Sequence, residues 1–215
     1  MIPLRDVIPS RTTPYITVTI IAVNAVAWLF ELAMPRDLLP NFLQAYGVIP
    51  ADFRVPTLVT SMFLHGGWSH VIGNMWYLWI FGDNVEDRVG HGRFIVFYLL
   101  CGFVAALGQV AIDPNSTLPT IGASGAIAGV MGAYFVLYPQ SRVLTLVPFL
   151  WFQIVEVPAI VLLGFWFLLQ LFNAGALASA TSTGGGVAFA AHVAGFLVGM
   201  GGIFVFRKRE LNARW

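Results

Sequence analysis

Two residues with the chemistry of acyl transfer stand in apolar stretches of this chain, Ser124 and His192. Ser124 lies in the segment Gly122-Ala123-Ser124-Gly125, directly before an apolar run that ends at Tyr138. A serine in the first turn of a buried helix, beside backbone N–H groups that have no partner within the helix, is suited to act as a nucleophile. The alternative is an N-cap serine on a tightly packed membrane helix.

His192 lies near the start of the last apolar run. An ionisable side chain inside a membrane helix is costly, which makes it a functional candidate, although a lone histidine that reaches the membrane interface is the alternative. Small residues recur on both helices, at Gly125, Gly129 and Gly132 and at Gly195 and Gly199. Such faces let two backbones approach closely, so Ser124 Oγ is expected within hydrogen-bond reach of the His192 imidazole.

His70 and Asn74 are four residues apart and therefore share one helix face. Both side chains can donate hydrogen bonds, and with the backbone N–H of Ser124 they would form an oxyanion hole. A polar clamp between helices is the alternative. We expect no zinc, because His65 and His70 do not have the spacing of a helical zinc motif.

The elements that position these residues are transmembrane helices. The chain has 215 residues, of which 58% are hydrophobic and 10% are charged, whereas soluble domains are about 25% charged. We therefore expect an all-α polytopic membrane protein with a single domain, residues 1–215. Six spans are predicted, at about 16–34, 70–88, 94–112, 124–138, 156–172 and 187–206. The first lacks a convincing cleavage site and is expected to be a signal anchor, and the single cysteine, Cys101, excludes an intramolecular disulfide.

The fourth span is short. About 15 residues make roughly 22 Å of helix, which is less than the roughly 30 Å of a bilayer core. Its N-terminus, with Ser124, is therefore expected below the membrane surface. Nine Arg and Lys residues fall on the side of both termini and two on the other side, so both termini are predicted to be cytoplasmic and the site to open to the extracytoplasmic side.

These residues together resemble the rhomboid intramembrane serine proteases. The motifs that carry the resemblance are His65-Gly66-Gly67-Trp68, His70-x-x-x-Asn74, Gly122-x-Ser124-Gly125 and Ala191-His192-x-x-Gly195. The resemblance covers all six predicted spans and implies a Ser124–His192 dyad, an oxyanion hole from His70, Asn74 and the Ser124 backbone, and no metal or cofactor. It also implies single-pass transmembrane protein substrates, cleaved near small residues. We expect contacts with membrane lipids, no binding of nucleic acid, and a place in the bacterial inner membrane.

The chain departs from the rhomboid pattern at Ala128, where many relatives have a tyrosine that stacks on the catalytic histidine. The resemblance therefore leaves open what holds His192. Two other functions stay open as well, a catalytically silent rhomboid-like protein that binds membrane clients and a small transporter.

Other polar and aromatic residues are expected to be structural. Glu86, Asp87 and Arg88 are predicted at a solvated helix end, Glu156 at a helix start, and Trp166 in packing or against lipid. The glycine-rich loop 174–186 and the helix before it are predicted to form a movable cover over the site.

Overall fold

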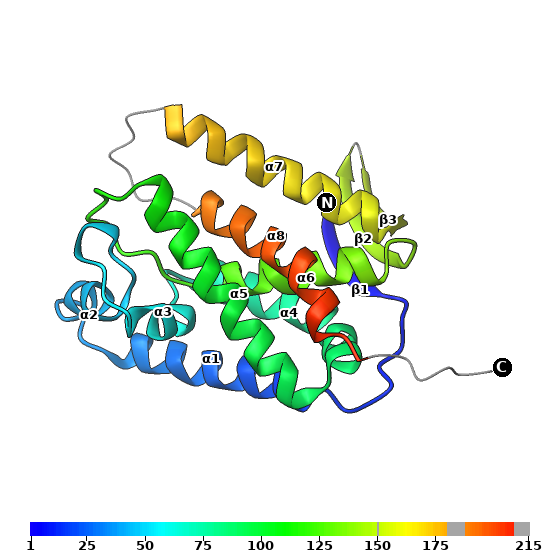
Figure 1. The fold of residues 1–215 in the computed structure, drawn as a ribbon, viewed down its shortest axis with the longest axis horizontal. Helices are drawn as coiled ribbons and strands as arrows, with labels where there is room; N and C mark the ends of the chain where they lie inside the picture. The colour runs from blue at the N-terminus through cyan, green and yellow to red at the C-terminus, as the bar shows by residue number, and fades with distance from the viewer. Residues whose placement is uncertain (150, 180–187, 209–215) are drawn as a thin grey trace.

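The computed structural model describes residues 1–149, 151–179 and 188–208, and the chain is mostly helical (Figure 1). Four helical segments in these ranges are long and apolar enough to cross a membrane: α1 (Tyr15–Ala33), α5 (His91–Ile112), residues Ala159–Ala176 of α7 (Ala159–Ser179), and α8 (Phe189–Phe206). None of these segments contains a proline, so each can form all of its internal backbone hydrogen bonds, as a lipid environment requires.

Two further helices of more than ten residues lie between these segments in the described chain, α4 (Trp68–Val89) and α6 (Ser124–Leu137). The last two turns of α4 carry three acidic residues and an arginine, and α6 has only 14 residues. By length and composition the described residues therefore contain four candidate spans. Each of the six predicted ranges overlaps a helix, but the count of six spans stays a prediction.

The α6 helix lies in the interior, in contact with α4, α5, α7 and α8 (Figure 1). Ten of its 14 residues are buried. Its glycine face meets that of α8 so closely that a Cβ added to Gly199 would lie 1.9 Å from the carbonyl oxygen of Gly129. A Cβ added to Gly195 would lie 2.1 Å from the oxygen of Gly125. The predicted contact between two small-residue faces is thus confirmed.

A three-stranded antiparallel sheet, which the sequence analysis did not predict, adjoins the helices. Its order is β1 (Ile2–Asp6), β2 (Arg142–Phe149) and β3 (Trp151–Pro158). Ile2 pairs with Leu146 and Asp6 with Val143, and the register shifts between Pro3 and Arg5. Strand β3 leads directly into α7. Glu156 is an exposed residue of β3, so its predicted place at a helix start was wrong.

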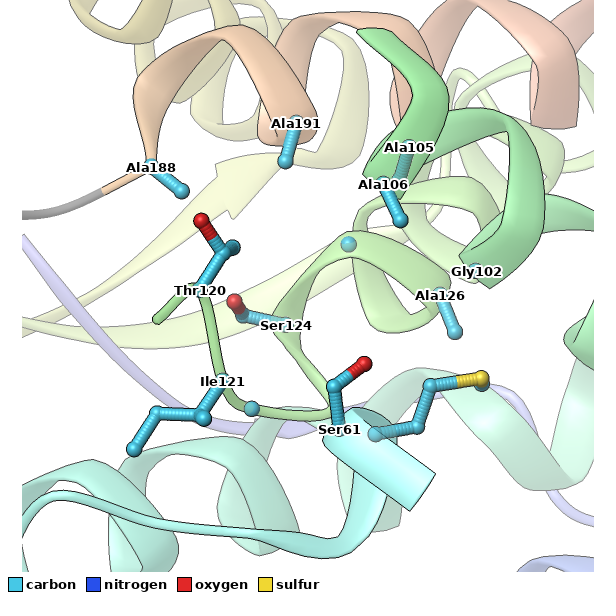
Figure 2. A pocket seen from close by; sticks show the side chains of 13 residues that line it. Ser61, Gly102, Ala105, Ala106, Thr120, Ile121, Ser124, Ala126, Ala188 and Ala191 are labelled. Atoms are coloured by element: carbon cyan, nitrogen blue, oxygen red, sulfur yellow. The ribbon is translucent and has the colours of Figure 1, made fainter. Parts of the chain in front are cut away.

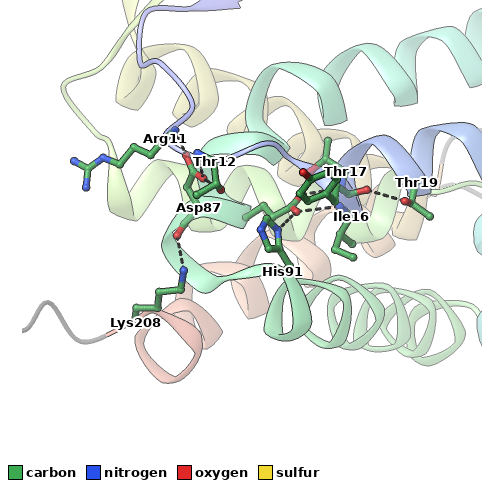
Figure 3. Close-up of polar contacts among 10 residues, drawn as sticks. Arg11, Thr12, Ile16, Thr17, Thr19, Asp87, His91 and Lys208 are labelled. Atoms are coloured by element: carbon green, nitrogen blue, oxygen red, sulfur yellow. Dashed lines mark hydrogen bonds and ion pairs between the residues drawn. The ribbon is translucent and has the colours of Figure 1, made fainter.

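The segment before α1 runs along the end of α4 (Figure 3). Glu86 is fully buried and accepts hydrogen bonds from the backbone N–H groups of Ile16 and Thr17, at 3.0 and 2.8 Å. It also contacts the ring of His91. The predicted solvated position of Glu86 was therefore wrong, because this carboxylate satisfies N–H groups that the first turn of α1 leaves without a helical partner.

Short helices make up much of the connection between α1 and α4: α2 (Leu39–Tyr46), η1 (Pro50–Asp52), α3 (Thr57–Thr60) and η2 (Ser61–Phe63). The predicted loop 174–186 is partly incorrect, since α7 continues to Ser179. The glycine run of that prediction, residues 184–186, lies outside the described residues.

Candidate active site

Ser124 is the first residue of α6 and is presented by a turn that needs glycine. Gly122 has a φ of 119°, a backbone conformation that side chains other than glycine rarely adopt. Its N–H donates to the carbonyl of Ser61 at 2.8 Å, and the preceding residues are held by a two-bond bridge between Thr120 and Val48. Because Ala123 is the N-cap residue and no side chain caps this helix, the alternative reading of Ser124 as an N-cap serine does not hold.

The structure brings Ser124 and His192 together, as the glycine faces predict. Ser124 Oγ lies 2.8 Å from His192 Nε2, within the hydrogen-bond distance that a nucleophile and its general base need. The two residues stand in the first turns of α6 and α8, the pair of helices with the close glycine contact. His192 is 9% exposed, so its ring is held inside the protein rather than at the surface.

His70 and Asn74 lie beside the turn that carries Ser124. A Cβ added to Gly122 would lie 2.6 Å from His70 Nε2 and 3.6 Å from Asn74 Nδ2, so both nitrogens point at this turn. His70 Nδ1 accepts a hydrogen bond from the N–H of Gly66 at 3.3 Å. A neutral imidazole that accepts at Nδ1 carries its proton on Nε2, so His70 offers a donor to the space around Gly122.

Asn74 offers the second donor. Its side chain is buried, and its Nδ2 has no hydrogen-bond partner among the residues that the structure describes. A buried amide nitrogen without a partner is destabilising, unless a group that is not part of the chain accepts its hydrogen bond. Both nitrogens therefore have the position and chemistry of donors to a substrate oxygen.

A cavity of about 30 Å³ opens beside Ser124 (Figure 2). Small side chains form much of its wall, namely Ala105 and Ala106 of α5, Ala191 of α8 and Ala188, the N-cap residue of α8. Thr120 and Ile121 form the side next to the turn. The volume exceeds the roughly 10–15 Å³ that a cavity needs to hold one water molecule, so the space can admit water or a methyl-sized group next to the serine oxygen.

The structure also shows what surrounds His192, which the sequence does not reveal. Ala128 is fully buried, and its methyl side chain cannot stack on the imidazole of His192. The ring of Trp166, from α7, lies instead 5.8 Å from the imidazole between centroids, at an interplanar angle of 34°. Gln170, one turn further along α7, places Oε1 2.9 Å from His192 Nδ1. The sequence signal for Gln170 was present but unused, as it is a lone amide within the apolar run 159–172.

His65, part of the motif that carried the resemblance, lies behind the site rather than in it. It is buried, and its ring packs edge-on against His70 with centroids 5.0 Å apart. Its backbone N–H donates to the carboxylate of Glu31 on α1. In the described ranges, no group of three or more His, Cys, Asp or Glu side chains is placed to hold a metal ion.

Known proteins with similar sequences share one family. The family model described as the rhomboid domain matches residues 52–209, which is most of the chain. The chain is 31% identical over 127 residues to YdcA of Bacillus subtilis, whose name is that of a rhomboid protease; this match covers 58% of the chain and 62% of YdcA. It is 30% identical over 201 residues to rhomboid-like protein 11, chloroplastic, of Arabidopsis thaliana, over 86% of the chain and 66% of the relative.

A third relative is the rhomboid protease GluP of Bacillus subtilis, with 36% identity over 85 residues, 40% of the chain and 16% of GluP. The matches thus span about two thirds or less of the length of these relatives. The matched region includes His70, Asn74, Ser124 and His192. With its apolar helices, the chain is an integral membrane protein, and it belongs to the rhomboid family.

Proposed function

We propose that this protein is an intramembrane serine endopeptidase in which Ser124 is the nucleophile and His192 the general base. One observation carries the proposal, the 2.8 Å contact between Ser124 Oγ and His192 Nε2 at the buried ends of two helices. Membership of a family that contains proteases supports the same reaction class. The family match alone supports a less specific conclusion, that the protein belongs to the rhomboid family and lies in a membrane.

The reaction is acyl transfer in two stages. Ser124 Oγ bonds to the scissile carbonyl carbon while its proton passes to His192 Nε2, and the carbonyl oxygen becomes an oxyanion. The C–N bond then breaks and His192 returns the proton to the leaving amine. Water hydrolyses the acyl-enzyme by the same proton transfers in the second stage. This cycle uses no metal and no cofactor.

The oxyanion is stabilised by His70 Nε2–H, by the amide of Asn74 and by the backbone N–H of Ser124. The donor tautomer of His70 and the lack of a partner for Asn74 Nδ2 among the described residues support these roles. Donors that are already oriented in a site shielded from water act mainly on the transition state, and loss of one costs roughly 10²–10³-fold in kcat.

The substrates are single-pass transmembrane proteins, cut next to a small residue. The cavity beside Ser124, about 30 Å³ and lined mostly by alanine and glycine, supports a small side chain at the cleaved bond. A helical substrate must unwind locally to expose its peptide bond to Ser124, so a segment with low helix propensity is the expected cleavage point.

The chain crosses the membrane six times, with α4 and α6 as the two spans beyond the four clear ones, and both termini are cytoplasmic. The bias of nine cationic side chains to two supports this orientation. Hydrogen bonds also support a common side for the two termini. Thr12, near the N-terminus, and Lys208, near the C-terminus, both donate to Asp87 (Figure 3). We place the protein in the bacterial inner membrane, with the site open to the extracytoplasmic side.

The test is labelling of the detergent-solubilised protein with a fluorophosphonate probe, together with cleavage of a panel of single-pass substrates. We expect labelling and cleavage in the wild type, and loss of both in Ser124→Ala and in His192→Ala. The double variant should be no less active than either single variant, because the two residues act as a unit. Ser116→Ala, a serine in the loop before α6, is the matched control and should react as the wild type does.

Two results would contradict the proposal. Cleavage by purified Ser124→Ala protein would assign the reaction to another group. A wild-type protein that neither reacts with the probe nor cleaves any substrate, yet binds single-pass clients, would be a silent rhomboid-like protein.

A further inference from the structure

Gln170 is a buried amide on α7 that faces the imidazole of His192. It is 9% exposed, and its Oε1 lies 2.9 Å from His192 Nδ1. An amide oxygen only accepts hydrogen bonds, so the bond runs from Nδ1–H to Oε1. Within the described part of the chain, His192 Nδ1 has no other hydrogen-bond partner.

This bond determines the tautomer of the histidine. A neutral imidazole has one ring proton, and when Nδ1 carries it, Nε2 presents a lone pair. Nε2 is the atom 2.8 Å from Ser124 Oγ. The arrangement therefore prepares His192 to take a proton from Ser124, whereas the opposite tautomer would face the serine with an N–H group.

The same helix limits how the ring can turn. Trp166 is four residues before Gln170, so both project from one face of α7. Its ring lies beside the imidazole at 5.8 Å, and Phe189 approaches from another side, with centroids 6.5 Å apart at 88°. Rotation of the imidazole about its bond to Cβ would break the hydrogen bond to Gln170 and meet these rings.

The geometry points to Gln170 as the positioning residue of the Ser124–His192 pair, the third member of a Ser–His–Gln relay in which the amide oxygen holds the imidazole in its base tautomer. The inference rests on the proposed function, since it presumes that His192 acts as a base. An amide suits this place because it is neutral. A carboxyl group here would be protonated, because an unpaired carboxylate buried in the membrane is costly, and its carbonyl oxygen would still accept a hydrogen bond from Nδ1–H.

The test compares Gln170→Met, which keeps the length of the side chain but has no acceptor oxygen, with Gln170→Glu, which restores one. Asn173→Met is the matched control, the same amide-to-thioether change one turn further along α7, where the amide donates a hydrogen bond to the carbonyl of Leu169 on its own helix. For Gln170→Met we expect kcat to fall by about 10–10²-fold with KM within about twofold, as expected when an interaction matters mainly in the transition state. Gln170→Glu should recover most of the loss, and Asn173→Met should match the wild type.

A second readout does not depend on proteolysis. In protein labelled with ¹⁵N-histidine, the ring signals of His192 are identified by their loss in His192→Gln. We expect the wild type and Gln170→Glu to show the Nδ1–H tautomer, and Gln170→Met to show a mixture. The thermal unfolding midpoint of each variant shows whether the fold is intact.

The outcomes separate the two proposals. A mixed tautomer in the wild type, or the Nδ1–H tautomer kept in Gln170→Met, overturns the role of Gln170 even if Ser124 is the nucleophile. A fixed tautomer that depends on Gln170, in a protein without probe labelling or cleavage, keeps the hydrogen bond and overturns the protease. Loss of kcat in Gln170→Met without recovery in Gln170→Glu assigns Gln170 to packing.

Discussion

Asn74 buries an amide nitrogen for which the described residues supply no hydrogen-bond acceptor. We predict that Asn74→Ala lowers kcat by roughly 10²–10³-fold while KM changes little, because a donor to the oxyanion acts in the transition state. The loss of kcat will be smaller if His70, at the same turn, still stabilises the oxyanion in the variant. Steady-state kinetics on a single-pass substrate measure the effect.

Thermal unfolding is the control for Asn74→Ala. The variant removes a buried polar atom without a partner, so its stability should not fall by more than the small cavity costs. A raised KM with unchanged kcat would reassign Asn74 to substrate binding.

The contact between Ser124 and His192 was predictable from the sequence, and the contact of Gln170 with His192 was not. Ser124 and His192 stand next to glycine patterns that fix which helices meet, so their contact followed from spacing. Gln170 has no such pattern around it. Its role depends on the rotation of α7 about its own axis, which an almost uniformly apolar helix does not reveal.

At the scale of elements, the contact between α6 and α8 determines whether the dyad can form. We predict that Gly199→Ala destabilises the protein by about 1–3 kcal/mol, as overpacking does, because its new Cβ would lie 1.9 Å from a backbone oxygen of α6. Probe labelling at Ser124 should fall with it, since α8 also carries His192. Unfolding in increasing denaturant and the labelling rate are the two measurements.

Gly201→Ala is the matched control in the same helix, since nothing lies within 4 Å of its added Cβ. It should be neutral or slightly stabilising, as alanine is the better helix former by about 1 kcal/mol. Equal behaviour of the two variants would show that the close approach of α6 and α8 is not required.

The helices could be predicted because long apolar runs in a membrane protein have few other solutions. The sheet could not. Residues 142–158 are apolar and rich in β-branched side chains, and two prolines made their reading ambiguous. Strand β1 forms by pairing with β2, which lies more than 130 residues away in the chain. A local sequence pattern does not indicate such a distant partner. Glu86 was misread for a related reason, since its partners lie on α1.

At the scale of the whole molecule, the N-terminal strand joins the sheet to the helical bundle. The carbonyl of Pro3 accepts a hydrogen bond from Trp76 of α4 at 2.7 Å, and Asp6 accepts one from Tyr134 of α6 at 2.7 Å. Burial raises the pKa of the Asp6 carboxyl to about 6, from about 3.9 in an unfolded chain. Protonated Asp6 is therefore favoured by folding.

This shift predicts a pH dependence of stability. The contribution of Asp6 is complete below about pH 4 and is lost as the pH rises through about 6. Between pH 4 and pH 7 the thermal unfolding midpoint of the wild type should fall relative to that of Asp6→Asn, whose side chain stays neutral. Parallel curves for the two proteins would show that Asp6 does not titrate in this range.

The orientation in the membrane is a second prediction at this scale. In a Cys101→Ala background, a cysteine at Asn115 should react with a membrane-impermeant maleimide from the extracytoplasmic side. A cysteine at Gly92, where an added side chain meets nothing within 4 Å, should react only from the cytoplasmic side. The reverse labelling pattern would contradict the proposed topology.

The helix that holds His192 in place is also the one expected to move. Trp166 and Gln170 both stand on α7, while Ser124 and His192 stand on the closely packed pair α6 and α8. If α7 swings outward to admit a substrate, it takes the acceptor away from Nδ1, and the histidine loses its base tautomer. The hydrogen bond would then couple reactivity to closure of α7. With α7 open, His192 could not accept the proton of Ser124, and closure around a substrate would restore this ability. The observed kcat would scale with the fraction of substrate-bound protein in which α7 is closed, so substrates that hold the helix shut would be cut faster even when they bind no more tightly.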